Sequence, residues 1–448
     1  MTHARARINP GRISSSYKWQ VVGMLWLVCA FNYADRQCIF SVFPRLKAEF
    51  GFGPVQLGLI GSAFMWTYAL GSPLAGFAGD HLSRKRLILG GCLFWSATTA
   101  LTGLCAKFWQ FVTVRAVVGV GETVYFPASL SLLSDYHSRR TRSRALSIHQ
   151  SGIYIGTILG GWLGAWFAVN FGWRAGLYFF GVSGGIMALV MMRFLKDVRR
   201  GAADGAGGPK GAASEAAAQK LGVGEALRIF RAKPTACLLM LVFLGANFVG
   251  TIFLTWTPSF LVDKFNFSLI EAGLFGTLYF SLASAVGSPL GGWLADRLAQ
   301  NFVGGRMLVQ ASGLLTGAAL IALVALTPKI GVLLGSMTLF GFCKGLYDSN
   351  IWASLYDVIE PRARGTATGI MNSVGWGGGA LGPIFVGLVT KYGRHATQVA
   401  NMSEAIACGA AIYVVCGVAM LLIVFCRAGK DILPAPANAV NSSEAPPL

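Results

Sequence analysis

The stretch GVGETVYFPASLSLLSDYHSRRTRSRALSIHQS, residues 119–151, decides the fold because a related stretch occurs again later in the chain. It aligns without gaps on GFCKGLYDSNIWASLYDVIEPRARGTATGIMNS, residues 341–373. A shorter pair repeats in the same order, GSPLAGFAGD at 71–80 and GSPLGGWLAD at 287–296. Self-similarity over such a length indicates a repeated structural unit, so the sequence predicts two halves with the same topology.

Both halves consist mainly of apolar runs. The 448 residues are 54% hydrophobic and only 12% charged, which is too few charges to cover a soluble protein of this size. Runs of about 20 apolar residues, enough to cross a bilayer as a helix, recur along the chain. We therefore predict an all-α membrane protein with twelve transmembrane helices in two pseudo-symmetric six-helix bundles. The predicted spans lie near residues 19–43, 56–78, 87–105, 109–133, 145–169, 174–195, 234–262, 270–294, 307–327, 331–356, 365–390 and 404–426.

The domain organisation follows from the composition between the spans. The stretch GAADGAGGPKGAASEAAAQK, between the sixth and seventh spans, is rich in Gly and Ala and cannot build a core. We predict an N-terminal segment over 1–18, a first bundle over 19–196, a linker over 197–233, a second bundle over 234–426 and a tail over 427–448.

The charge distribution predicts the orientation of the chain. The formal net charge is +19, and most of the 37 basic residues lie in the tails and in the loops on the same side as the N-terminus. By the positive-inside rule, both termini and the linker are cytoplasmic. The basic residues thus serve as topology determinants, and we expect no nucleic-acid partner. The nine cysteines lie singly in or near apolar stretches without CxxC spacing, so we also expect no metal site.

Charged residues inside two of the spans are candidates for a functional site. Asp35 and Arg36 follow Phe31-Asn32-Tyr33-Ala34 in the first span, where each charge costs about 2.5–3.5 kcal/mol on insertion scales. Arg115 and Glu122 lie seven residues apart in the fourth span, and therefore on one face of the helix. Neither has an oppositely charged neighbour three or four residues away, so we expect both to face the first span.

This charged set can bind an anion and a proton. Two guanidinium groups in a dry cavity bind a carboxylate with paired hydrogen bonds, which points to a substrate that carries a carboxylate. The protonation of Asp35 or Glu122 then depends on whether substrate occupies an arginine, which would link proton and anion movement. The alternative is that Arg36 and Arg115 only neutralise the two acids.

Several motifs resemble those of a known superfamily. GDHLSRKR at 79–86, after the second span, resembles the loop signature of the major facilitator superfamily, and the resemblance covers nearly the whole chain. Within it, NYADR at 32–36, RAVVGVGE at 115–122 and QSG at 150–152 resemble the anion:cation symporter family. Bacterial sugar-acid and hexuronate proton symporters belong to that family. The resemblance implies proton-coupled symport of a small organic anion, such as a hexuronate or aldonate, by alternating access across a bacterial inner membrane.

The resemblance also implies roles for particular residues. Asp35 and Glu122 match the proton sites of the sugar-acid symporters, while Asp80 and Arg84 match a cytoplasmic gate. No cofactor is expected apart from the proton as coupling ion, and the chain is expected to act as a monomer. Together with Lys344, which the internal repeat suggests, the predicted substrate-binding residues are Tyr33, Arg36, Tyr68, Arg115, Gln150, Lys344, Ser349, Trp352 and Asn372.

Lys344 is singled out by the repeat and not by the resemblance. The alignment of the two halves places Lys344 opposite Glu122, so an acid and a base occupy equivalent positions. Asp348 lies four residues further along the same helix and can pair with Lys344. Two interpretations stay open: a simple pair within one helix, or contact of Lys344 with Glu122 or with a second anionic group of the substrate.

Two other functions were weighed. Spinster-like lysophospholipid transporters share an NYxDR stretch and an RxxVGxGE motif, and are the nearest alternative. Gln150, Ser349 and Asn372 favour a polar cavity and hence a sugar acid. A membrane-embedded enzyme is not expected, because the sequence contains no nucleophile elbow, HExxH motif or nucleotide-binding loop.

Overall fold

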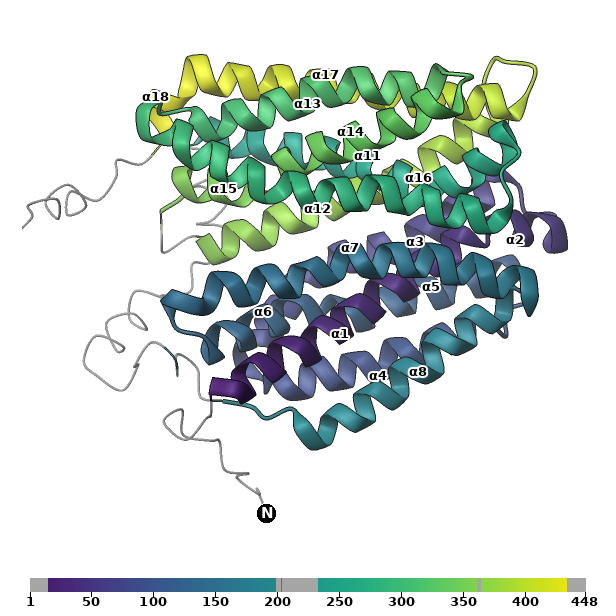
Figure 1. The fold of residues 1–448 in the computed structure, drawn as a ribbon, viewed down its shortest axis with the longest axis horizontal. Coiled ribbons are helices and arrows are strands. Elements are labelled where there is room, and N and C mark those ends of the chain that lie inside the picture. Colours follow the sequence, from purple (N-terminus) through teal and green to yellow (C-terminus); the bar gives the residue numbers. More distant parts are fainter. Residues whose placement is uncertain (1–14, 199–202, 204–232, 361–363, 433–448) are drawn as a thin grey trace, which may run out of the picture.

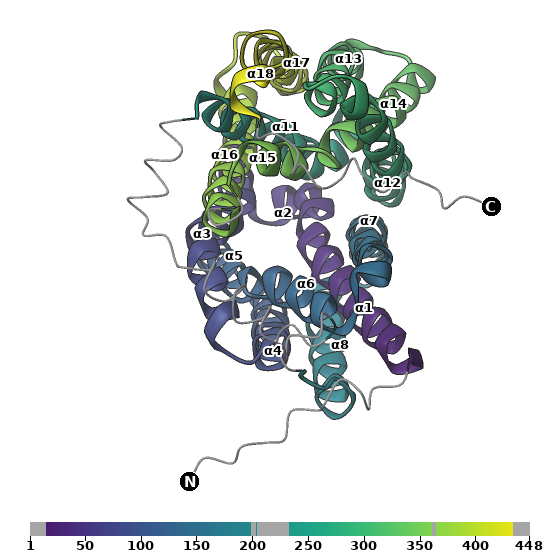
Figure 2. The ribbon, with the colours of Figure 1, turned by 90° about the vertical axis from the view of Figure 1, so that its left-hand side faces the viewer.

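A computed structural model describes residues 15–198, 203, 233–360 and 364–432 (Figure 1). Most of the predicted N-terminal segment, linker and tail therefore lies outside the described residues. The structure shows two bundles of long helices that lie side by side, one from each half of the chain (Figures 1 and 2).

The first bundle contains the helices before the linker. Its long helices alternate in direction, and a short helix, α2, follows α1 at one end (Figure 1). The bounds are α1 Ser15–Ser41, α2 Phe43–Phe50, α3 Pro54–His81, α4 Arg84–Thr102, α5 Phe108–Thr123, α6 Tyr125–Tyr136, α7 Arg139–Asn170 and α8 Trp173–Phe194.

The second bundle repeats this plan after the linker. In each bundle the fourth long helix is interrupted. The interruption separates α5 from α6 in the first bundle and α14 from α15 in the second. The bounds are α11 Pro234–Phe265, α12 Leu269–Asn301, α13 Gly305–Leu326, α14 Ile330–Asp348, α15 Ile351–Val358, α16 Arg364–Tyr392, α17 Gln398–Leu422, a π-helical turn Ile423–Arg427 and α18 Ala428–Asp431.

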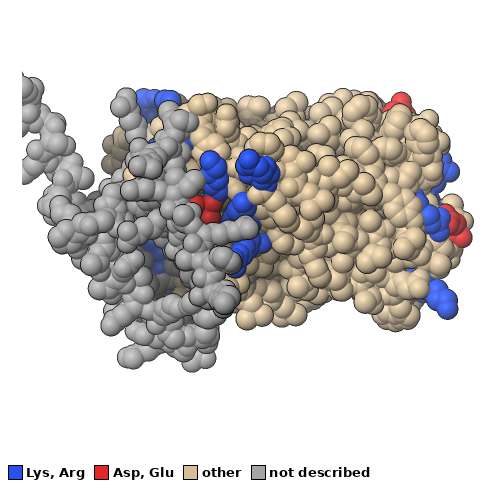
Figure 3. Space-filling view, turned by 90° about the horizontal axis from the view of Figure 1, so that it is seen from below, with Lys and Arg blue, Asp and Glu red and all other residues tan. Residues whose placement is uncertain are grey.

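The predicted fold class is confirmed. When α5 with α6 and α14 with α15 are each counted as one broken helix, the elements correspond to the twelve predicted spans. Within the described ranges, nine helical segments are long and apolar enough to cross a membrane by length and composition. On the face seen in Figure 3, charged side chains lie toward the two ends, and a broad uncharged band separates them. That band is the surface expected to face lipid.

Glycines hold the first helix of each bundle against a partner helix. Gly160 on α7 faces Ala34 on α1 so closely that a Cβ atom there would lie 2.6 Å from the Ala34 Cα. In the second bundle, Gly378 on α16 lies against Leu244 on α11, and a Cβ would lie 2.5 Å from that carbonyl oxygen. Small residues permit this close helix packing. Because successive residues turn by about 100°, Arg36 projects from the side of α1 away from Ala34 and α7.

The two bundles also contact each other. We call the end where α1 begins and α18 ends the tail end, and the opposite end, where α2 lies, the loop end (Figure 1). Toward the loop end, the Gln37 side chain donates to the Leu254 carbonyl at 2.9 Å, and Lys47 lies 3.9 Å from Asp263. These contacts join the two bundles on the loop-end side of Arg36, where Lys47 and Asp263 also line a second cavity.

Candidate functional site

A cavity of about 110 Å³ lies between the two bundles. Three charged residues line this cavity, and they come from both halves of the chain: Arg36 lies on α1, and Lys344 and Asp348 lie on α14. The remaining wall is aromatic, apolar or uncharged polar. It consists of Tyr33, Gln37, Phe40, Met65, Thr157, Phe243, Ala246, Asn247, Gly250, Thr251, Leu254 and Trp376.

Arg36 forms a buried ion pair with Glu122. Its Nε and Nη2 atoms donate to Oε2 of Glu122 at 3.1 and 2.5 Å, and Nη2 also donates to Oδ1 of Asn32 at 3.3 Å. Among the described residues, Nη1 of Arg36 and Oε1 of Glu122 have no hydrogen-bond partner. The guanidinium group at the cavity wall thus keeps one unused donor nitrogen, and its carboxylate partner keeps one unused acceptor oxygen.

Aromatic rings surround the Arg36 guanidinium group. Its central carbon lies 4.5 Å from the ring centres of both Tyr33 and Phe64, 5.2 Å from that of Trp376 and 5.4 Å from that of Tyr68. Cation–π contacts of this kind stabilise a charge that has left water. Since Trp376 comes from α16, both bundles contribute to this enclosure.

Asp35, the residue before Arg36 on α1, points to another side of the helix and is also buried. Its Oδ2 accepts a hydrogen bond of 2.6 Å from the Thr99 hydroxyl on α4, whereas its Oδ1 has no partner among the described residues. Among the described residues, Asp35 thus forms no direct salt bridge with an arginine, although the sequence allowed that alternative. A carboxyl group with one free oxygen can accept a proton without losing its contact to Thr99.

Arg115 faces the first span, as its position in the fourth span predicts, but it does not line the cavity. It is 1% exposed, is not part of the cavity wall, and lies beside the rings of Phe64 and Phe40 at 5.3 and 6.0 Å. Its Nε and Nη2 have no hydrogen-bond partner in the described part of the chain. Seven residues along a helix correspond to about 10 Å, which places Arg115 well toward the loop end from Glu122. The two arginines therefore do not form one fork around a single carboxylate in this structure.

The second charged pair at the cavity wall is Lys344 with Asp348. The two side chains form an ion pair one helical turn apart on α14, which is the first of the two interpretations given for Lys344, and contact with an anionic group of the substrate stays a prediction. Lys344 does not contact Glu122. Asp348 is the last residue of α14, and the chain resumes a helix only at Ile351. Glu122 similarly precedes the break between α5 and α6. Interrupted helices at the interface of two repeats are typical of transporter binding sites.

Residues 25–383 match the Major Facilitator Superfamily. The chain belongs to this superfamily. It is a multi-pass membrane transporter and not an enzyme, as the sequence indicated.

Relatives within the superfamily support the narrower resemblance. A probable chloroplastic anion transporter of Oryza sativa subsp. japonica is 28% identical over 84% of this chain, which spans 64% of the rice protein's length. A probable galactarate/D-glucarate transporter of Bacillus subtilis is 25% identical over 86% of this chain and 88% of that protein. A crystal structure of a bacterial Spinster homologue, inward-facing and occupied, has a TM-score of 0.77 with 21% identity, covering 94% of this chain and 98% of that one. This last likeness shows the superfamily fold alone.

Four other predicted substrate-binding residues do not line the cavity. Trp352 stacks edge-on against Phe243, a wall residue, with 5.1 Å between the ring centres. The Asn372 amide donates to the Ser72 hydroxyl at 3.0 Å and so joins α16 to α3. Ser349 lies in the break after α14 and donates to the Leu346 carbonyl at 3.2 Å. Gln150, on α7, is exposed and is not part of the wall.

Some wall residues were missed by the sequence analysis. Trp376, Gln37 and Thr157 were not predicted, although they are polar or aromatic residues within spans. For Trp376 a signal existed, since it is the single large side chain in the glycine-rich stretch 375–379. Thr99, the partner of Asp35, has no motif that would have revealed it.

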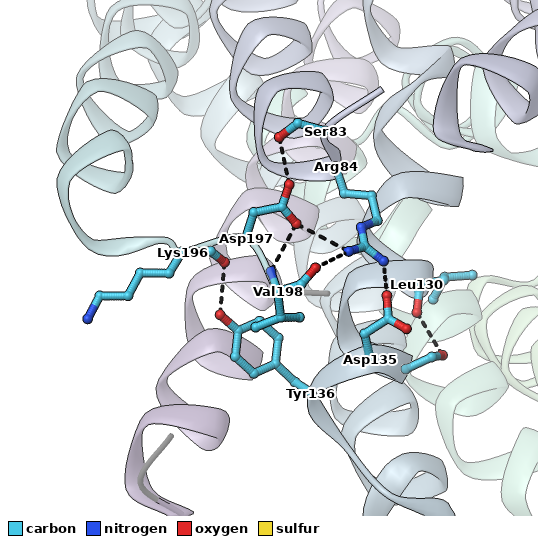
Figure 4. Close-up of polar contacts among 9 residues, drawn as sticks. Ser83, Arg84, Leu130, Asp135, Tyr136, Lys196, Asp197 and Val198 are labelled. Atoms are coloured by element: carbon cyan, nitrogen blue, oxygen red, sulfur yellow. Dashed lines mark hydrogen bonds and ion pairs between the residues drawn. The ribbon is translucent and has the colours of Figure 1, made fainter. Parts of the chain in front are cut away.

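The predicted cytoplasmic gate forms a charged cluster at the tail end (Figure 4). Arg84, at the start of α4, forms ion pairs with Asp135 on α6 and with Asp197, and its Nη2 donates to the Val198 carbonyl at 2.5 Å. The Ser83 hydroxyl donates to Asp197 at 2.6 Å. These partners all belong to the first half, so they tie the helices of one bundle together. The side chain of Asp80 lies outside the described residues.

This cluster corrects the predicted start of the linker. The composition suggested that the linker begins at 197, but Asp197 and Val198 are anchored beneath Arg84, and Val198 is 1% exposed. The preceding Lys196 carbonyl accepts a hydrogen bond of 2.8 Å from Tyr136. The first bundle therefore extends to residue 198. Across the described ranges, no three His, Cys, Asp or Glu side chains are grouped in a way that could hold a metal ion.

Proposed function

We propose that this chain is a proton-coupled symporter that imports a small sugar acid by alternating access. It would lie in a bacterial inner membrane with both termini in the cytoplasm, as the distribution of basic residues favours. Relatives named as anion and galactarate/D-glucarate transporters support the substrate class. The cavity between two repeated bundles supports the mechanism.

The observation that carries the proposal is the buried pair that Glu122 forms with Arg36, a residue of the cavity wall. Removal of one member of a buried ion pair costs about 3–5 kcal/mol, so we expect Arg36 to keep an anionic partner throughout the cycle. Two anions can fill this role for Arg36: the Glu122 carboxylate, or a carboxylate of the substrate. When the substrate binds Arg36, Glu122 becomes an unpaired buried carboxylate unless it takes up a proton. Anion binding and proton uptake are thereby linked.

The return step follows from the same geometry. Loss of the substrate to the cytoplasm leaves Arg36 without an anion, and this favours the ionised form of Glu122, which releases its proton and pairs with Arg36 again. The restored pair leaves no unpaired charge at the cavity wall, so the empty carrier can reorient. Asp35, with its free Oδ1 and its hydrogen bond from Thr99, is the second candidate for a proton site in this cycle.

Alternating access requires the inter-bundle contacts at the loop end to open. These contacts include two polar ones, the Gln37 to Leu254 hydrogen bond and the Lys47 to Asp263 pair, together with the packing of Phe43 against Trp256 and of α3 against α16 at Gly58 and Pro383. The Lys47 to Asp263 pair is long and partly exposed, so it contributes little stability and can separate readily. Rocking of one bundle against the other would then expose the cavity to the opposite side of the membrane.

Uptake into proteoliposomes tests the proposal. We expect the wild-type protein to accumulate D-glucarate or a hexuronate when the outer solution is more acidic than the lumen. The Glu122→Gln variant should bind the anion but fail to accumulate it against a gradient. Glu404→Gln is a matched control, because Glu404 pairs with Arg394 near the loop end, outside the cavity. Full proton-driven accumulation by Glu122→Gln would contradict the mechanism, and transport of lysophospholipid in place of every sugar acid would favour the Spinster-like alternative.

A further inference from the structure

The cavity contains a second cation that the proton cycle does not use. Lys344 and Asp348 reach the cavity wall from α14, whereas Arg36 reaches it from α1 in the other bundle. The cavity therefore offers a cation on each of its two sides, and each cation has a carboxylate partner. A ligand with one anionic group needs only one of these cations.

The two pairs differ in how firmly they are closed. The side chains of Arg36 and Glu122 are 8% and 0% exposed, while those of Lys344 and Asp348 are 20% and 31% exposed. An ion pair in contact with water is weak, and its members separate at little cost. Asp348 can therefore leave Lys344 and remain hydrated, without needing the proton that a displaced Glu122 needs.

The surroundings of Lys344 leave its ammonium group accessible. A lysine carries three donors, and the pair with Asp348 accounts for one. On the facing helix, α11, residue 250 is a glycine, and a Cβ there would lie 3.3 Å from the Cε atom of Lys344. Gly250 and Asp348 are both wall residues, so the space around the ammonium group belongs to the cavity itself.

We propose, building on the proposed function, that the substrate is a linear dicarboxylate that bridges the two bundles. One carboxylate binds Arg36 in place of Glu122, and the other binds Lys344 in place of Asp348. A dianion matches both cations and joins α1 to α14, so its binding draws the two bundles together. Lys344 is then the residue that distinguishes a dicarboxylate from a monocarboxylate, because a neutral terminal group cannot displace Asp348.

The alternative role for Lys344 is a structural pair at the end of α14. An i, i+4 pair of this kind contributes about 0.2–0.5 kcal/mol to a helix. That role gives no reason for a preference between two ligands of the same length. Ligand selectivity therefore separates the two roles, whereas protein stability does not.

Calorimetric titration of the purified full-length protein with D-glucarate and D-gluconate provides the test. The two acids have six carbons each and differ at one end, where glucarate carries a carboxylate and gluconate a hydroxymethyl group. We expect the wild type to bind glucarate about tenfold more tightly, as one charged hydrogen bond allows. Lys344→Met should lose this preference by weakening glucarate binding about tenfold while leaving gluconate binding unchanged.

Two further variants sharpen the result. Lys329→Met removes a lysine from the other end of α14, outside the cavity, and should change neither affinity. Asp348→Asn removes the competing carboxylate, and should therefore strengthen glucarate binding with no effect on gluconate. If Lys344→Met does not fold, the Asp348→Asn variant carries the test alone, since a purely structural pair predicts no gain in glucarate affinity.

The outcomes separate this inference from the function on which it rests. Equal affinities for the two acids in the wild type, or equal losses for both in Lys344→Met, would overturn the dicarboxylate assignment and leave the sugar-acid symporter standing. Failure to bind either acid would overturn the proposed function, and the dicarboxylate assignment would fall with it.

Discussion

The two ion pairs whose cations line the cavity are similar in composition but differ in their surroundings. Arg36 and Glu122 come from two helices, are almost fully buried, and are enclosed by four aromatic rings. Lys344 and Asp348 come from one helix and are in contact with the open cavity. The first pair cannot separate without a replacement for each charge, whereas the second can. Burial, more than residue type, is therefore the basis on which we propose that one pair couples to a proton and the other selects the ligand.

Removal of the buried cation should have the largest effect. Arg36→Gln deletes the guanidinium that holds Glu122, and anion binding should weaken at least about a hundredfold, equivalent to about 3 kcal/mol. Calorimetric titration with D-glucarate measures this loss. Arg394→Gln is the matched control, because Arg394 is exposed near the loop end, where its partner is Glu404. Binding retained within a factor of about three by Arg36→Gln would show that this arginine does not hold the substrate.

Arg115 provides the next test, because its burial resembles that of Arg36 but its position does not. It lies beside the rings of Phe40 and Phe64 and is not among the residues that line the cavity. Arg115→Met should therefore weaken anion binding less than Arg36→Gln does, through a change in the local field and not through a lost contact. Calorimetric titration of both variants with D-glucarate measures the two losses of affinity. A complete loss of binding in Arg115→Met would instead show that Arg115 reaches the substrate directly in another state of the cycle.

The packing of α7 against α1 supports the Arg36 and Glu122 pair, and a substitution outside the site can disturb this packing. A valine in place of Gly160 collides with the backbone of α1 at Ala34, next to Asp35 and Arg36. Overpacking of this kind costs about 1–3 kcal/mol, so Gly160→Val should lower the melting temperature. Gly185→Ala on α8 is the control, because nothing lies within 4 Å of the added Cβ. Unchanged melting in Gly160→Val would mean that α1 can shift away from α7 freely.

The smallest effect on stability is expected at the exposed pair. Asp348→Asn removes a partly hydrated ion pair within one helix, so the free energy of unfolding should change by less than about 1 kcal/mol. Thermal denaturation of the purified protein gives this value. A much larger loss would show that the Lys344 pair is a structural contact and would remove the contrast between the two sites.

The internal repeat explains why so much of the fold was predictable. The four-residue spacing of glycines in α7 and α16 shows in the letters, and the structure uses Gly160 and Gly378 for equivalent helix contacts. The polar residues of the first span were conspicuous for a similar reason, since charge in an apolar run is costly. Position along a helix and cost of burial are both properties of the local sequence.

The features that escaped prediction depend on contacts between distant residues. Helical spacing placed Arg115 and Glu122 on one face, but whether Arg115 reaches the cavity depends on how the rings of Phe40 and Phe64 pack beside it. Composition ended the first bundle before Asp197, yet the position of that residue follows from Arg84, more than a hundred residues earlier. Such contacts can be predicted only when the arrangement of the helices in space is known. The periodicity of the sequence alone does not give that arrangement.

The central claim is that the substrate and Glu122 compete for Arg36, so that anion binding drives proton uptake. Proton uptake on binding can be measured directly by titrating the detergent-solubilised protein with D-glucarate in weakly buffered solution that contains a pH indicator. We expect the wild type to take up protons as it binds the anion, and Glu122→Gln to bind with clearly reduced uptake. Equal proton uptake by the two proteins at equal occupancy would contradict the account.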